Sequence, residues 1–142
     1  MTNPLNYQIS LFTEENYFHV QVTGDATPEA IIKMYNDLTL FGKAHNIANI
    51  LVNISSVLLT YSSSEILKSM QKLQPILFGF KIARVVCMSN FKNDLIEAIS
   101  EDKLMNVKNF DNNEMALDWL IRNPSTDKTI TSDKSGLTTC DI

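Results

Sequence analysis

Two short runs near the N-terminus alternate apolar and polar residues. The runs are Tyr7–Phe12 and Tyr17–Val22, and in the second run every other residue from Phe18 onward is apolar. A period of two is typical of strands that bury one face. The runs are joined by Thr13–Asn16, and so short a connection favours an antiparallel hairpin. We therefore predict two paired strands at the start of the chain.

Four later segments repeat their apolar residues at the spacing of an α-helix. The first begins at Thr27, whose hydroxyl can cap a helix that continues with Pro28. The second begins at Ser62, where Ser62 and Glu65 match a capping box. The apolar stripes of the four predicted helices are Ile31, Met34, Tyr35, Leu38 and Phe41; Ile66, Met70, Leu73 and Leu77; Leu95, Ile96 and Ile99; and Met115, Ala116, Trp119 and Leu120.

Three predicted strands lie between the predicted helices. Ile50–Ile54 is short, branched and mostly apolar, which is typical of a central strand in a parallel sheet, Ile82–Met88 reads as another buried strand, and Met105–Phe110 is the last strand. The complete order is β-β-α-β-α-β-α-β-α, which implies parallel pairing through right-handed crossovers. We predict a single-domain α/β fold with a mixed sheet. Its first two parallel runs should pair at the centre, and the N-terminal strands should add an antiparallel edge.

If the parallel strands lie side by side in chain order, right-handed crossovers place all helices on one face of the sheet. The other face is then expected to stand in water, because its N-terminal side chains are largely polar. These side chains are Gln8, Ser10, Tyr17, His19 and Gln21. Aromatic and polar residues together suit a protein contact. Apolar side chains on the same strands leave a sheet edge that needs protection, which favours a homodimer.

The apolar pattern stops near Asn123. A length of 142 residues suits one domain, which we place at residues 1–123. Residues 124–142 are rich in Ser, Thr, Asp and Lys and are predicted to form a polar tail. Within this tail, Thr129–Thr131 and Leu137–Thr139 leave a hairpin open as an alternative.

The balance of charges argues against several classes of partner. The formal net charge is -4 and the isoelectric point lies near 5.1, whereas nucleic-acid binding needs a concentrated basic face. Arginine occurs only as Arg84 and Arg122. No apolar run approaches the roughly 18 residues needed to cross a bilayer, and the N-terminus lacks the pattern of a signal peptide. We expect a cytoplasmic protein that contacts neither nucleic acid nor membrane.

Reactive side chains are few and far apart. His19 and His45 are the only histidines, and neither has a companion at the spacing of a metal site or a catalytic triad. The only cysteines are Cys87 and Cys140, which we expect to be reduced thiols, with Cys87 inert in a buried strand. Neither glycine-rich phosphate-binding motif is present. We predict no metal, no cofactor and no enzymatic activity.

Two stretches of the chain carry a family resemblance. Asn53–Ser64 reads NISSVLLTYSSS and follows, without a gap, the pattern D-L-S-x-V-x-x-x-D-S-S-G of STAS domains. In those domains the pattern leads from a central strand into the next helix. Val107–Asp111 and Ala116–Leu120 look like the closing strand and the last helix of SpoIIAA-like proteins. The chain thus resembles the SpoIIAA-like branch of the STAS superfamily over roughly residues 7–120.

The resemblance implies a non-enzymatic module that binds proteins and regulates bacterial signalling. In the anti-sigma-factor antagonists of this family a regulated serine occupies the position of Ser62, which implies a phosphorylation site. The alternative is that Ser62 only caps its helix. Tyr61 and Ser64 stand where the family pattern has an aspartate and a glycine, and Asn53 replaces its first aspartate. The predicted contact residues are Tyr61, Ser62, Ser63, Ser64, Tyr17 and His19.

A second function stays open beside the interaction module. SpoIIAA-like domains are also grouped with lipid-binding folds of the SEC14 type. That grouping implies a cavity between the helices and the sheet for a small apolar ligand or lipid. The partner is therefore a protein, a second copy of the chain or a small apolar molecule.

Overall fold

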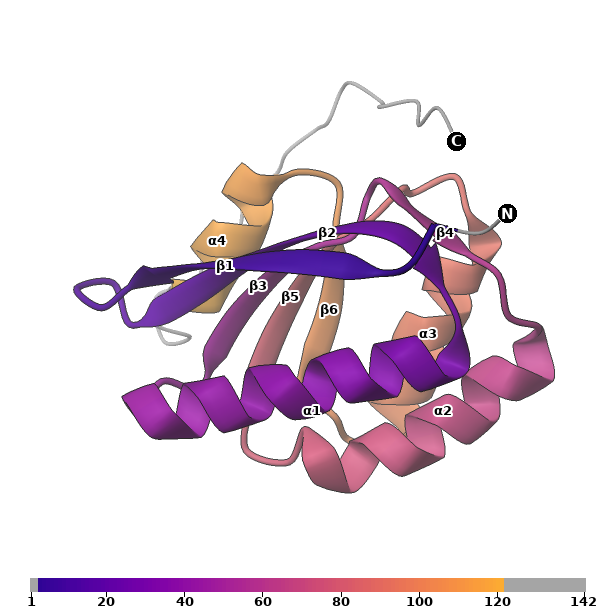
Figure 1. Ribbon diagram of the computed structural model, residues 1–142, viewed down its shortest axis with the longest axis horizontal. Helices are drawn as coiled ribbons and strands as arrows, with labels where there is room; N and C mark the ends of the chain where they lie inside the picture. Colours follow the sequence, from indigo (N-terminus) through magenta and orange to yellow (C-terminus); the bar gives the residue numbers. More distant parts are fainter. Residues whose placement is uncertain (1–2, 122–142) are drawn as a thin grey trace.

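The computed structural model describes residues 3–121 (Figure 1). Its elements are β1 (Asn6–Phe12), β2 (Tyr17–Ala26), α1 (Pro28–His45), β3 (Asn49–Asn53), β4 (Val57–Leu59), α2 (Ser63–Ile76), β5 (Lys81–Val85), α3 (Phe91–Asp102), β6 (Val107–Phe110) and α4 (Asn113–Ile121). The predicted helices and strands are present, but the predicted order lacked β4. The predicted tail at 124–142, with its alternative hairpin, and Cys140 lie outside the described residues.

Within residues 3–121 the strands form one mixed sheet in the order β1-β2-β3-β5-β6. β1 is antiparallel to β2, and the remaining neighbours along this order are parallel. Ile50 of β3 lies opposite Ile82 of β5, which confirms the predicted central pair. The antiparallel N-terminal edge is confirmed as well. β4 pairs in parallel with the second half of β2, where Val57 lies opposite Gly24.

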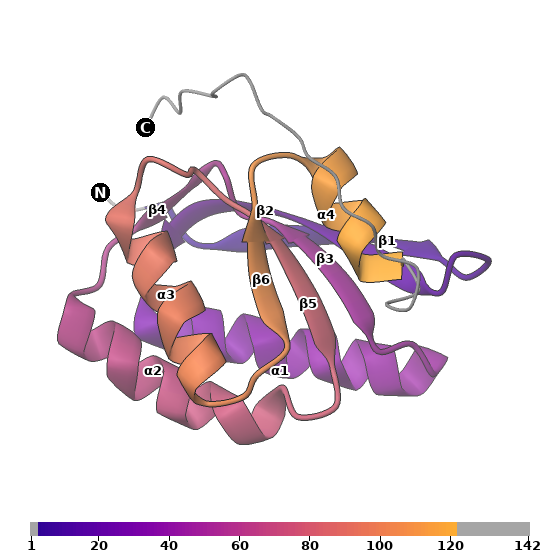
Figure 2. The ribbon, with the colours of Figure 1, turned by 180° about the vertical axis from the view of Figure 1, so that it is seen from behind.

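Helices cover both faces of the sheet. α1, α2 and α3 lie on one face and α4 lies on the other (Figure 1, Figure 2), so the expectation that all helices lie on one face is wrong. Gln8 and Ser10 of β1 are exposed as expected, but α4 covers the central strands of the second face.

The central strands explain the difference, because they are apolar on both sides. Leu51, Ala83 and Val85 turn to the second face, where they form a buried cluster with Leu120 of α4. Tyr17 belongs to the same cluster and is buried, not exposed.

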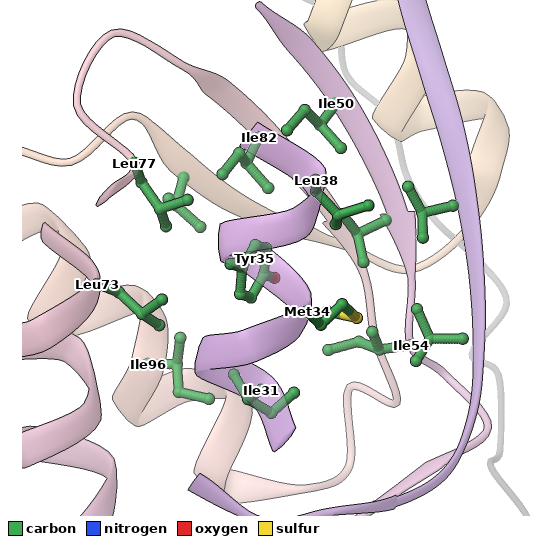
Figure 3. Close-up of a cluster of buried hydrophobic side chains, with 14 of the residues drawn as sticks. Ile31, Met34, Tyr35, Leu38, Ile50, Ile54, Leu73, Leu77, Ile82 and Ile96 are labelled. Atoms are coloured by element: carbon green, nitrogen blue, oxygen red, sulfur yellow. The ribbon is translucent and has the colours of Figure 1, made fainter. Parts of the chain in front are cut away.

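The larger core lies between the sheet and α1 (Figure 3). Met34 and Leu38 of α1 join Ile50 and Ile82 of the strands in one almost fully buried cluster. α2 packs chiefly against α1 and α3, and it contacts the sheet much less. It is therefore an outer wall above the space that α1, α3 and the sheet enclose.

Candidate functional site

A small cavity lies beneath α2. Its volume is about 30 Å³, which holds one or two water molecules. The walls come from α1, α2, α3 and the sheet and are almost entirely apolar. Figure 3 shows Leu73 of α2, Ile96 of α3 and Tyr35 of α1 coming together at this place.

Arg84 lines this cavity from β5, one residue before the strand ends at Val85. Only 4% of its surface is exposed. Its guanidinium donates two hydrogen bonds to side-chain amides, from Nη1 to Asn109 Oδ1 at 2.6 Å and from Nη2 to Asn93 Oδ1 at 3.1 Å. Both asparagines are fixed in turn, since Asn93 donates to the carbonyl of Cys87 and Asn109 donates to the carbonyl of Asn93. Neutral amide groups therefore fix the orientation of the guanidinium.

No carboxylate of the described residues forms an ion pair with Arg84. In residues 3–121 the ion pair at salt-bridge distance is that of Lys33 with Asp37. Glu97 touches the same network, but its carboxylate accepts the backbone N–H of Asn109 at 2.9 Å. Burying a cation without a counter-charge costs several kcal/mol even after relaxation. Amide oxygens offset part of this cost, and an anion in the cavity would offset more.

Two phenols share the cavity with Arg84. Burial raises the pKa of Tyr35, although the charge of Arg84 and a hydrogen bond with it act in the opposite direction. Burial also raises the pKa of Tyr61, to about 12. Both phenols therefore keep their protons at neutral pH and can donate hydrogen bonds. The polar corner of the cavity thus combines one cation with two neutral donors.

The start of α2 matches the predicted capping box. Ser62 Oγ accepts the backbone N–H of Glu65 at 3.2 Å, and Glu65 Oε1 accepts the backbone N–H of Ser62 at 2.9 Å. Ser62, Ser63 and Ser64 are exposed. Tyr61 is not, because only 4% of its surface remains exposed. Its side chain faces the cavity and is not available to a partner at the surface.

The other two predicted contact residues lie across the sheet from α2. Tyr17 is buried beneath α4 and stacks on Phe12 with ring centroids 4.9 Å apart. His19 is half-buried; burial lowers its pKa and a hydrogen bond with Asn113 acts against this. The structure therefore does not bring these two residues together with Ser62. The predicted contact surface is reduced to Ser62, Ser63 and Ser64.

The described residues contain few other reactive groups. Within residues 3–121, no three His, Cys, Asp or Glu side chains gather in a way that could hold a metal ion. Cys87 is buried, and its Sγ lies 3.1 Å from Ser89 Oγ. None of the helices in this part of the chain combines the length and the apolar character that a bilayer crossing requires.

Sequence reasoning did not identify Arg84 as a site residue. The composition distinguishes it only as one of two arginines. The available signal was its position, because an arginine in the middle of the apolar run Ile82–Met88 must be buried with the rest of the strand. Its partners were not visible, since they lie 9 and 25 residues further along the chain.

Comparison with known proteins gave no match to any model of a protein family and no similar curated protein. The resemblance to SpoIIAA-like proteins therefore rests on the short motifs in Asn53–Ser64 and near the last helix.

Proposed function

We propose that this protein is a non-enzymatic binding module that holds a small apolar ligand in the cavity beneath α2. The observation that supports this proposal is the cavity itself, which is lined by apolar side chains and by Arg84. Small-molecule sites are typically concave and mostly apolar, with a few placed polar groups. A cavity of about 30 Å³ admits a ligand only if its wall yields. α2 is the wall most able to yield, because it rests on two helices and hardly on the sheet.

A matched pair of variants on α2 tests this proposal. Ile66 is fully buried and lines the cavity, whereas its neighbour Leu67 is largely exposed. Ile66→Phe should fill the cavity, and Leu67→Phe should leave it open. 1-Hexanol is expected to raise the melting temperature of the wild type and of Leu67→Phe, since a ligand of the folded state stabilises it. The same alcohol should have no effect on Ile66→Phe. Equal responses of the two variants would contradict the proposal.

A second candidate function uses the outer end of α2. Ser62 presents an exposed hydroxyl at the helix start, where a phosphate would meet free amides and the positive end of the helix dipole. A STAS-type interaction module regulated at this serine remains our proposal for this surface. α2 is also the cavity wall, so a ligand and a protein partner would act on the same helix. Ser63 and Ser64 would lie in the same contact.

Phosphopeptide mass spectrometry of protein isolated from its native cell tests the second candidate. A phosphorylated Ser62 peptide under some growth condition is the expected result. Ser62→Asp should then fold like the wild type and change partner binding. A serine that is never phosphorylated, with unchanged partners for Ser62→Asp, would leave Ser62 with its capping role only.

We propose membership of the SpoIIAA-like branch of the STAS superfamily, a role in bacterial signalling and a cytoplasmic location. We also propose a homodimer, which would protect the open edge of the sheet at β1.

A further inference from the structure

We infer that the ligand of the cavity beneath α2 is a monocarboxylate with a short apolar chain, and that the Arg84 guanidinium binds its carboxylate. This inference rests on the proposed function, because it names the chemistry of the molecule that the cavity holds. It does not depend on a partner protein or on Ser62.

The charge of the site selects a single anion. Arg84 is the one charged side chain among the described residues that line the cavity. One buried cation matches one negative charge, whereas a dianionic phosphate would bring a second charge with no partner. A carboxylate also fits the fork of a guanidinium, which it can contact with both oxygens.

The network around Arg84 holds the guanidinium ready for such a ligand. Asn109 and Asn93 each accept from one Nη nitrogen, and Tyr35 accepts a third hydrogen bond from Arg84. Two of the five N–H groups of the guanidinium therefore remain for a ligand. The asparagines do not neutralise the charge, so the electrostatic gain from a carboxylate remains available. Because their own amide groups are bonded to backbone carbonyls, binding requires little reordering.

The apolar walls of the cavity match the hydrocarbon chain of such a monocarboxylate. Ile66 and Leu73 of α2 and Ile96 of α3 supply apolar walls, and the protonated Tyr35 and Tyr61 supply donors near the charged end. Figure 3 shows Leu73 and Ile96 on the side of α2 and α3, facing Tyr35 of α1. The small volume, about 30 Å³, favours a short chain, and each added methylene requires further displacement of α2.

Hexanoate and 1-hexanol distinguish this inference from the proposed function. The two probes have the same chain, and only hexanoate carries a charge at neutral pH. Calorimetry should give a lower Kd for hexanoate than for 1-hexanol with the wild type. Arg84→Met should weaken hexanoate binding by about 10- to 100-fold, the range expected for a hydrogen bond to a charged group. It should change 1-hexanol binding by less than about threefold, which also shows that the variant folds.

Two further variants complete the test. Lys81→Met removes a cation from the same strand, outside the cavity, and should bind hexanoate like the wild type. Asn93→Asp retains Arg84 but places a carboxylate on its Nη2, and should weaken hexanoate binding as Arg84→Met does. This variant keeps the test decisive if Arg84→Met does not fold.

The outcomes separate the two claims. If 1-hexanol binds and hexanoate binds no more tightly, the carboxylate inference is wrong and the cavity proposal stands. Undiminished binding of hexanoate to Arg84→Met or to Asn93→Asp would also overturn the inference. If neither probe binds the wild type, both claims are wrong.

Discussion

At the scale of residues, the Ser62 hydroxyl accepts the backbone N–H of Glu65 at 3.2 Å and donates to Glu65 Oε1 at 3.3 Å. Ser62→Ala removes the acceptor for the backbone N–H of Glu65. We expect a loss of about 0.5–2 kcal/mol in the free energy of unfolding, as for other caps. Urea unfolding measures this loss. Ser62→Asp should keep most of the stability, since aspartate also caps helices.

Ser63→Ala is the matched control for the cap. Ser63 is exposed and follows the cap as the first residue of α2. Its replacement should change the free energy of unfolding by no more than about 0.5 kcal/mol. Equal losses for Ser62→Ala and Ser63→Ala would show that the capping box adds no stability.

The ionisation of Tyr61 makes the free energy of unfolding depend on pH in the alkaline range. Burial raises its pKa from 10.0 to about 12, so the unfolded chain loses this proton at a lower pH than the folded chain. The contribution of the neutral phenol is fully present below about pH 10. Between about pH 10 and pH 12 the unfolded state binds fewer protons, and the free energy of unfolding should fall. Tyr61→Phe should make this fall less steep in urea titrations.

Tyr7 provides the comparison for this pH effect. Its pKa is also raised to about 12, by burial and by a hydrogen bond with Asp37. Tyr7→Phe should therefore leave the Tyr61 contribution in place, and the double variant should flatten the profile most. An unchanged slope for Tyr61→Phe would mean that its phenol is not buried in solution.

The two site residues differ in how far the sequence could predict them. The bonds of Ser62 close within one turn of helix, so the spacing of Ser62 and Glu65 predicted them correctly. The bonds of Arg84 reach Asn93 on α3 and Asn109 on β6. Those contacts exist only after the sheet and α3 have packed, and no local pattern encodes them.

At the scale of elements, α4 is the helix that closes the second face of the sheet. Leu120 is buried there, with 2% of its surface exposed, whereas Ile121 is 44% exposed. Leu120→Ala should lower the free energy of unfolding by about 2–5 kcal/mol, because it opens a cavity over Ala83 and Val85. Ile121→Ala should cost no more than about 0.5 kcal/mol. Equal small losses in urea unfolding would mean that α4 does not hold this face.

The position of α4 was predicted wrongly for a physical reason. The rule of right-handed crossovers applies to a helix between two parallel strands. α4 follows β6, and no further strand follows it within the described residues. Its side of the sheet is then decided by which face is left apolar, and Leu51 and Val85 leave the second face apolar. β4 was missed because Val57–Leu59 is only three residues long.

At the scale of the whole molecule, β1 is an open edge of the sheet. Sedimentation at micromolar concentration should show a species of twice the chain mass of 16.0 kDa, since pairing at β1 would satisfy its free backbone groups. Ser10 is exposed on this strand. Ser10→Lys places like charges on both copies and should give a monomer without loss of thermal stability.

Gln71→Lys is the matched control for the dimer. Gln71 is exposed on α2 and does not belong to the edge strand β1. A lysine at this position adds the same charge away from the proposed interface and should leave the dimer intact. A single species of 16.0 kDa for the wild type throughout this range would rule out the proposed assembly.

A backbone amide at the junction between β4 and β2 should report on any movement of α2. The backbone N–H of Thr60 donates to the carbonyl of Ala26 at 3.1 Å, and its hydroxyl donates to the same oxygen at 2.7 Å. Two residues later the chain enters the cap of α2. A helix that swings outward pulls on this junction and opens the Thr60 amide to solvent deuterons. Deuterium uptake at this one amide would therefore time the proposed opening of the cavity, without any label on the ligand.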